Sequence, residues 1–199
     1  PTGLMLGTGT RVVATEKLHA QGNIIQTENS MDVSISGDGY FAIQQADGTM
    51  AYTRDGAFKM SSTGQLVTHG GEVLTPAITI PQNAAGITIG RDGTVTVELA
   101  NGGGATQVGQ IQVSRFINNS GLSPMGRNLM KESVASGAPI VGIPGSDGAG
   151  MLMQGALEAS NVNVVEELVN MIETQRAYEI NSRAISTSDQ MLQFITNNT

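Results

Sequence analysis

The C-terminal end of the chain is its longest stretch without glycine or proline. Residues 157–199 contain neither, whereas the 156 residues before them hold all 26 glycines and all six prolines. Because these residues most disfavour a helix interior, the contrast predicts one long α-helix, which we place from Val162 to Asn197. Such a helix would be about 54 Å long. Ser160 or Asn161 is expected to cap its first turn, since a short polar side chain accepts a free backbone N–H there.

Two stripes of apolar residues run along this predicted helix. One advances in alternating steps of four and three residues, the pattern of a coiled-coil seam, and includes the polar residues Gln175, Ser182 and Asp189. The second stripe is offset from the first and runs from Val165 to Ile195. A helix this apolar is not stable alone in water, so other helices or other chains must cover it. We therefore predict subunit contacts at Val164, Val165, Leu168, Ile172, Gln175, Tyr178, Ser182, Ile185, Leu192 and Ile195.

Residues 30–155 have the pattern of short antiparallel strands. Apolar and polar residues alternate, as in Met31, Val33 and Ile35, and Asp-Gly pairs recur where hairpin turns are expected. In tight hairpin turns glycine supplies the positive φ that other residues avoid. The predicted strands cover residues 31–36, 40–43, 50–54, 57–60, 65–68, 77–81, 87–89, 94–99, 109–116 and 151–154.

The chain therefore divides into three predicted parts. Residues 1–29 form an extended arm or linker, with short strands at 11–15 and 22–27. Residues 30–155 form a β-rich core domain, and residues 156–199 form a coiled-coil helix. The expected fold class is mainly β, antiparallel and rich in hairpins, with one long C-terminal α-helix that forms a coiled coil in an assembly.

Composition excludes several classes of partner. The net charge is −7 and the ten lysines and arginines form no basic cluster, so we expect no nucleic-acid binding. No apolar run approaches the roughly 20 residues needed to span a bilayer, so we expect no membrane insertion. The absence of cysteine rules out disulfides and thiolate metal sites.

No group of residues has the spacing of a catalytic, cofactor or metal site. His19 and His69 are far apart in sequence, and the aspartates of the Asp-Gly pairs are explained by turns. The densest polar clusters are residues 54–56 and 175–179. A turn and a solvated helix face would explain them, and contact between subunits is the alternative, which we favour for residues 175–179 because Tyr178 lies on the seam.

Several motifs together resemble those of the bacterial flagellar rod and hook family. They are SNVN at 160–163, QRAYE at 175–179, ISGDGYF at 35–41, AYTRDGAF at 51–58 and GQLVT at 64–68. Tyr40 stands where the family's strand motif has its first phenylalanine. Further matches extend over the whole chain and favour the members that form the distal rod.

The resemblance implies a structural protein rather than an enzyme, without catalytic, cofactor or metal residues. It implies export by the flagellar type III apparatus and helical self-polymerisation into a rigid hollow shaft, which crosses the periplasm and transmits torque to the hook. The implied partners are further copies of the chain, the proximal rod proteins, the hook protein, and the peptidoglycan and outer-membrane rings that act as a bushing. The family also has an N-terminal helix that pairs with the C-terminal one. No such helix precedes Pro1, so we expect about the first quarter of the family's polypeptide to be missing from this sequence.

Two other classes of function remain open at this stage. A β-rich extracellular module on a helical stalk could bind glycans if Tyr40, Phe41, Tyr52 and Phe58 formed an exposed aromatic platform, although their alternating strand positions favour the core. An enzyme acting on peptidoglycan would need a pair of carboxylates in a cleft, and the sequence offers no such pair outside turns.

Overall fold

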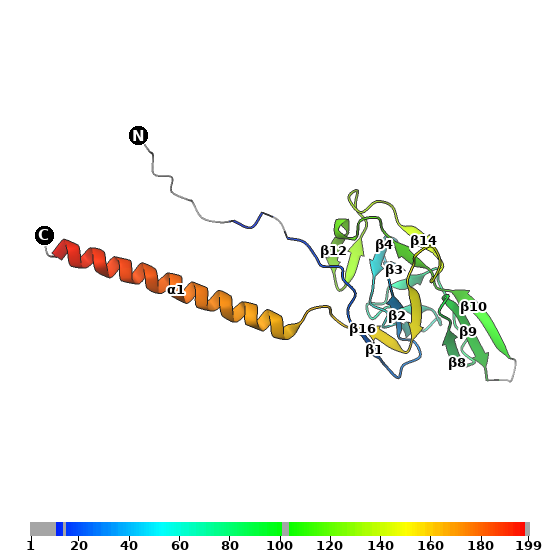
Figure 1. The fold of residues 1–199 in the computed structure, drawn as a ribbon. Helices are drawn as coiled ribbons and strands as arrows, with labels where there is room; N and C mark the ends of the chain where they lie inside the picture. The colour runs from blue at the N-terminus through cyan, green and yellow to red at the C-terminus, as the bar shows by residue number, and fades with distance from the viewer. Residues whose placement is uncertain (1–10, 14, 101–103, 198–199) are drawn as a thin grey trace. The chain divides into compact units, whose positions relative to one another are not determined.

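The computed structural model describes residues 11–13, 15–100 and 104–197, apart from the side chains of 192 and 195–197. The chain consists of two compact units (Figure 1), one that ends at Ala159 and one that starts at Ser160. The first is built from β-strands and the second contains the long helix α1, Val164–Asn197. This confirms the predicted fold class of antiparallel β structure followed by one long helix.

The strands of the first unit are short because glycine, proline and Asp-Gly turns interrupt the chain at close intervals. Their bounds are β1 Ile24–Gln26, β2 Val33–Ser36, β3 Tyr40–Gln44, β4 Met50–Thr53, β5 Lys59–Met60, β6 Leu66–Val67, β7 Val73–Thr75, β8 Ala84–Ile89, β9 Thr94–Leu99, β10 Ala105–Gln110, β11 Val113–Arg115, β12 Ser123–Gly126, β13 Leu129–Lys131, β14 Ile140–Gly142, β15 Met151–Gln154 and β16 Ala156–Glu158. A 3-10 turn, η1, covers Asn119–Gly121.

All strand pairs of the β unit are antiparallel among the described residues. The largest sheet has the order β12-β13-β4-β3-β7-β6-β5, and β11 joins it by pairing with β3 and β14. Strands β8, β9 and β10 lie side by side in a separate meander (Figure 1), while β15 pairs with β2. The last pair, β1 with β16, joins the first and last strands of the unit.

The core of the β unit lies between these sheets. Phe41 and Phe58 are fully buried there and meet edge to face, with ring centroids 5.1 Å apart. A smaller cluster on the other side of the large sheet contains Tyr40, Tyr52 and Phe116. In this cluster the rings of Tyr52 and Phe116 are 4.8 Å apart, also edge to face.

Most predicted strands are present, but three predictions are wrong. Residues 77–81 form no strand and pair only through an isolated bridge between Thr79 and Gln65. Residues 109–116 do not form one strand, because the chain leaves the ladder between β10 and β11. The described residues near Arg11 are not in a strand, and Ala14 lies outside the described residues.

The start of α1 also differs from the prediction. Residues 156–158 form β16, and the helix begins at Val164 rather than Val162. The cap is neither Ser160 nor Asn161 but Asn163, whose side-chain oxygen accepts the Val165 N–H at 3.2 Å. No helix in the described part of the chain is both long and apolar enough to span a membrane.

Candidate assembly surface

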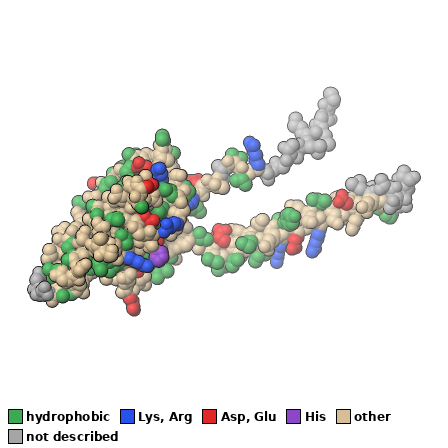
Figure 2. Space-filling model, turned by 180° about the vertical axis from the view of Figure 1, so that it is seen from behind, with side chains coloured by type: hydrophobic (Ala, Val, Ile, Leu, Met, Phe, Trp, Pro, Cys, Tyr) green, Lys and Arg blue, Asp and Glu red, His purple; other side chains and the backbone are tan. Residues whose placement is uncertain are grey.

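Every described side chain of α1 is exposed, the apolar ones included (Figure 2). Val165 has 70% of its surface exposed and Leu168 has 51%, whereas apolar residues of the β core fall below 9%. Exposure this high over a 34-residue helix is unusual, since helices in proteins gain most of their stability from the packing of an apolar side. The predicted contact residues with described side chains are all exposed: Val164, Val165, Leu168, Ile172, Gln175, Tyr178, Ser182 and Ile185. Leu192 and Ile195 lie on α1, but their side chains are outside the described ones.

The first third of α1 is amphipathic. Its apolar residues Val164, Leu168, Met171 and Ile172 lie on one side because they recur at intervals of three and four residues. Glu166 and Glu173 lie away from that side, whereas Glu167 lies at its edge, four residues before Met171. Acidic side chains in the first turn are also favoured by the positive end of the helix dipole.

Two threonines of α1 form hydrogen bonds within the helix. The Thr174 and Thr187 hydroxyls each donate to the carbonyl oxygen four residues earlier, at 2.8 Å. These two threonines therefore need no hydrogen-bond partner from another chain. The seam residues Gln175 and Ser182 remain predicted register-fixing contacts.

The side chain of Arg54 is mostly buried and bonds to other residues of the β unit. The Arg54 Nε atom lies 2.8 Å from the Glu158 Oε2 atom, and its other nitrogens donate to the carbonyl oxygens of Gly37 and Gly39 at 3.1 Å. Arg54 also stacks over the Tyr40 ring, 5.9 Å from its centroid. Arg54 therefore fastens the β2–β3 turn to β16.

A short strap formed by residues 16–22 lies along the β unit. Glu16 accepts the Ser120 hydroxyl at 2.7 Å, and the His19 Nδ1 atom lies 3.1 Å from the Tyr40 hydroxyl. Gln21 donates to the Ile35 carbonyl and accepts the Gly37 N–H, each at 3.1 Å. No local sequence pattern predicts this strap, because each of its bonds joins residues at least 14 positions apart in the chain.

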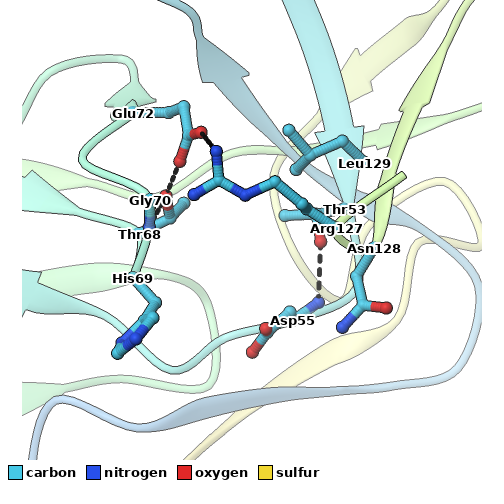
Figure 3. A pocket seen from close by; sticks show the side chains of 9 residues that line it. All are labelled: Thr53, Asp55, Thr68, His69, Gly70, Glu72, Arg127, Asn128 and Leu129. Atoms are coloured by element: carbon cyan, nitrogen blue, oxygen red, sulfur yellow. Dashed lines mark hydrogen bonds and ion pairs between the residues drawn. The ribbon is translucent and has the colours of Figure 1, made fainter. Parts of the chain in front are cut away.

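An open pocket of about 170 Å³ lies where the β6–β7 turn approaches the β12–β13 turn. Arg127 reaches toward Glu72 across it (Figure 3), with their closest charged atoms 3.7 Å apart. The Thr68 hydroxyl donates to the Glu72 carboxylate. This bond, more than the neighbouring Arg127, lowers the pKa of Glu72 below its ordinary value. Acidic and basic side chains both line the pocket. Its two carboxylates, Asp55 and Glu72, accept hydrogen bonds from nearby turn residues and do not form a catalytic pair.

The residues considered for other chemistry have structural roles. The four aromatic residues of the possible carbohydrate platform are each at most 3% exposed: Tyr40, Phe41, Tyr52 and Phe58. The hypothesis of an exposed platform that binds glycans is therefore wrong. Asp47 and Asp92 each accept hydrogen bonds from the threonine two residues later, which lowers the pKa of both carboxyls. Among the described residues, no three His, Asp or Glu side chains are grouped so that they could hold a metal ion.

Comparisons with known proteins agree with this arrangement of β unit and helix. Residues 34–97 match the D1 domain of the flagellar hook protein FlgE/F/G family, and residues 153–198 match the C-terminal region of flagellar basal-body rod FlgEFG proteins. The flagellar basal-body rod protein FlgG of Buchnera aphidicola from Acyrthosiphon pisum is 54% identical, over 97% of this chain and 74% of that protein. FlgG of Borreliella burgdorferi is 49% identical, over 99% of this chain and 75% of that protein. FlgG of Bacillus subtilis is 41% identical, over 96% and 74% respectively.

The β unit, the exposed helix and these matches define a structural protein of the flagellar rod and hook class. The chain belongs to the family of flagellar basal-body rod proteins. It is a structural subunit of the basal-body rod, with the FlgG type as its relatives over nearly its whole length. The family is not one of enzymes, and its members assemble with other rod and hook components.

Proposed function

We propose that this subunit polymerises with itself into a helical shaft whose inner layer is a coiled coil built from α1. The main support for this proposal is the apolar side of the first third of α1, where the side chains of Leu168 and Ile172 are about half exposed. Burying such a side chain contributes on the order of 1.5–3 kcal/mol before ordering costs. Contacts that join different surfaces of neighbouring copies generate an open filament when the rotation from one copy to the next does not close a ring.

The three parts of the chain have separate roles in this proposal. Residues 30–155 form the outer β core, which resists bending, and the segment 156–199 supplies the coiled-coil helix. Residues 1–29 form an arm that is fastened to its own β unit through residues 16–22 and β1, and the proposal is that this arm also contacts neighbouring copies. The N-terminal helix expected from the family would cover one side of α1, and neighbouring copies would cover the other.

The other flagellar proteins that this subunit would contact follow from the position of a distal rod segment. We propose that proximal rod proteins contact one end of the shaft and the hook protein the other. The peptidoglycan and outer-membrane rings would surround it as a bushing, and the flagellar type III apparatus would export the subunit. We propose no catalytic step, because the carboxylates of Asp47 and Asp92 accept backbone hydrogen bonds within their own turns.

Electron microscopy of the purified full-length protein tests the polymer. Straight tubes with helical symmetry are expected from the wild type. Leu168→Asp and Ile172→Asp should each prevent tube formation, because a charge cannot be buried in the apolar layer without a partner. Asn170→Asp is the matched control, since it adds the same charge on the polar side of the same turns and should leave assembly intact.

The outcomes separate the alternatives. Wild-type protein that stays monomeric at high concentration contradicts the proposal, as does normal assembly of both apolar-side variants. Loss of β structure in the Leu168→Asp variant, seen by circular dichroism, would show instead that α1 belongs to the core of the β unit.

A further inference from the structure

The apolar surface of α1 changes sides along the helix. Two helical turns take about 7.2 residues, so residues seven or eleven apart lie on nearly the same side. One side begins with apolar residues and becomes basic, in the order Val165, Ile172, Arg176 and Arg183. The neighbouring side begins acidic and becomes apolar, in the order Glu166, Glu173, Ile180, Ala184 and Met191. A single straight partner helix therefore cannot cover the apolar residues of both halves.

The charged residues on these two sides have matching spacing. Glu166 and Glu173 are seven residues apart, and so are Arg176 and Arg183, the only basic residues of α1. All four side chains are exposed, and within the described part of the chain neither arginine is in an ion pair. Two carboxylates and two guanidinium groups are thus presented at the same interval on different sides of one helix.

We propose that the acidic side of α1, formed by Glu166 and Glu173, contacts the basic side of α1 in a second copy, formed by Arg176 and Arg183. Two parallel helices displaced by ten residues, about 15 Å along the axis, bring both pairs together at once. The same displacement places the small Ala184 of one copy opposite the large Phe194 of the next, which is 70% exposed. The inference rests on the proposed polymer, since it names the contact that fixes the stagger between copies.

These charges set the register and the apolar layer supplies most of the stability. A single exposed ion pair contributes little, typically less than about 1 kcal/mol. Reversing one member of each pair replaces two attractions with two repulsions, and like charges held together are strongly unfavourable. The same contact repeats at every subunit, so a wrong stagger is disfavoured along the whole filament.

Charge reversal in the full chain tests the contact. We expect the double variants Glu166→Arg/Glu173→Arg and Arg176→Glu/Arg183→Glu each to raise the critical concentration for assembly by about tenfold or more. The quadruple variant, which exchanges both sides, should assemble. An equimolar mixture of the two double variants should also assemble, because each can contact the other through opposite charges. Glu167→Arg is the control, since Glu167 lies on neither side and its reversal should change little.

The mixture separates contact between copies from contact within one helix. Glu173 and Arg176 could pair three residues apart in the same helix, and mixing would then restore nothing although the quadruple variant assembled. That result overturns the inference, as does normal assembly of both double variants. An antiparallel pair would bring Glu166 to Arg183 and Glu173 to Arg176 in a closed dimer, so discrete wild-type dimers also overturn it.

A second measurement uses the wild type alone and does not depend on the folding of any variant. Between about 0.05 and 0.5 M NaCl the screening length falls from roughly 14 Å to 4 Å. The critical concentration should rise over this range, and a value independent of salt overturns the inference. Failure of the wild type to assemble under any condition counts against the proposed polymer itself, whereas a salt-independent tube counts against this contact only.

Discussion

The Arg54 Nε atom lies 2.8 Å from the Glu158 Oε2 atom, across 104 residues of sequence. The other carboxylate oxygen of Glu158 accepts the Gly22 N–H at 2.9 Å. Arg54 also holds the carbonyls of the β2–β3 turn, so one ion pair joins this turn, the strap and β16. The side chains of Arg54 and Glu158 are 21% and 11% exposed, which limits the competition from water.

Replacing Arg54 should therefore destabilise the β unit. Arg54→Met leaves the Glu158 carboxylate and the carbonyl oxygens of Gly37 and Gly39 short of a donor, and we expect a loss of about 2–3 kcal/mol. Urea unfolding followed by the near-ultraviolet circular dichroism of the buried tyrosines measures it. Arg127→Met is the matched control, because Arg127 is 70% exposed and 3.7 Å from Glu72, and it should cost less than about 1 kcal/mol. Equal losses in the two variants would show that the Arg54 pair has no special role.

The Asp-Gly pairs illustrate how much of the fold the sequence could predict. Gly39, Gly48 and Gly93 do have positive φ, as the turn interpretation requires. Gly56 does not, and its position is explained by space, since a Cβ there would lie 1.6 Å from the Val33 carbonyl oxygen. The same dipeptide thus has two physical causes, and only the turns are visible in a local pattern.

Gly56 and Gly48 should respond differently to alanine. Gly56→Ala forces β2 away from the Phe41–Phe58 core and should cost about 3 kcal/mol or more. Gly48→Ala meets nothing within 4 Å and should cost only the strain of its φ of 82°, about 1–2 kcal/mol. Thermal unfolding of the two variants compares them, and a smaller loss for Gly56→Ala would refute the assigned causes.

The strands that sequence reasoning missed share a lack of local signal. Strand β12 contains Pro124 and ends at Gly126, and β14 lies between Pro139 and Pro144, so composition favoured loops. These strands form because partners distant in sequence pair with them. The apolar pattern of α1, by contrast, could be predicted, because helical periodicity depends only on residues close together in the sequence. The chains that would cover this apolar surface could not be predicted in the same way.

The Glu72 carboxylate gives the β unit an acid-sensitive contact. Its folded-state pKa is lowered, chiefly by the Thr68 hydroxyl, so the contact stabilises fully above the ordinary pKa of 4.5. That stability is lost as the pH falls through the lower folded-state value. Thr68→Val should therefore reduce the melting temperature at about pH 6, and the difference from wild type should shrink as the pH falls toward about 3. A difference that does not change with pH would contradict this assignment.

Among the described residues, the buried hydroxyl of Ser114 finds no hydrogen-bond partner, in contrast to that of Ser136. Ser114→Ala removes an unpaired polar group and should leave stability unchanged or raise it by up to about 1 kcal/mol. Ser136→Ala, at a residue that is equally buried, removes bonds to Ser133 and should cost about 1 kcal/mol. Chemical unfolding of both variants checks the contrast, and a clear loss in Ser114→Ala would indicate a bound water.

The strap should detach in mild acid because of His19. Burial, then the nearby Lys17, lowers the pKa of His19, and Arg54 acts in the same direction while Glu16 opposes it. Since the docked state binds the proton less readily than the free strap, docking weakens as the pH falls below the ordinary histidine pKa of 6.5. Hydrogen exchange of residues 16–22, corrected for the intrinsic effect of pH, should accelerate between about pH 7 and pH 5. His19→Gln has no proton to gain and should show no such acceleration, so an equal increase in this variant would exclude His19 as the cause.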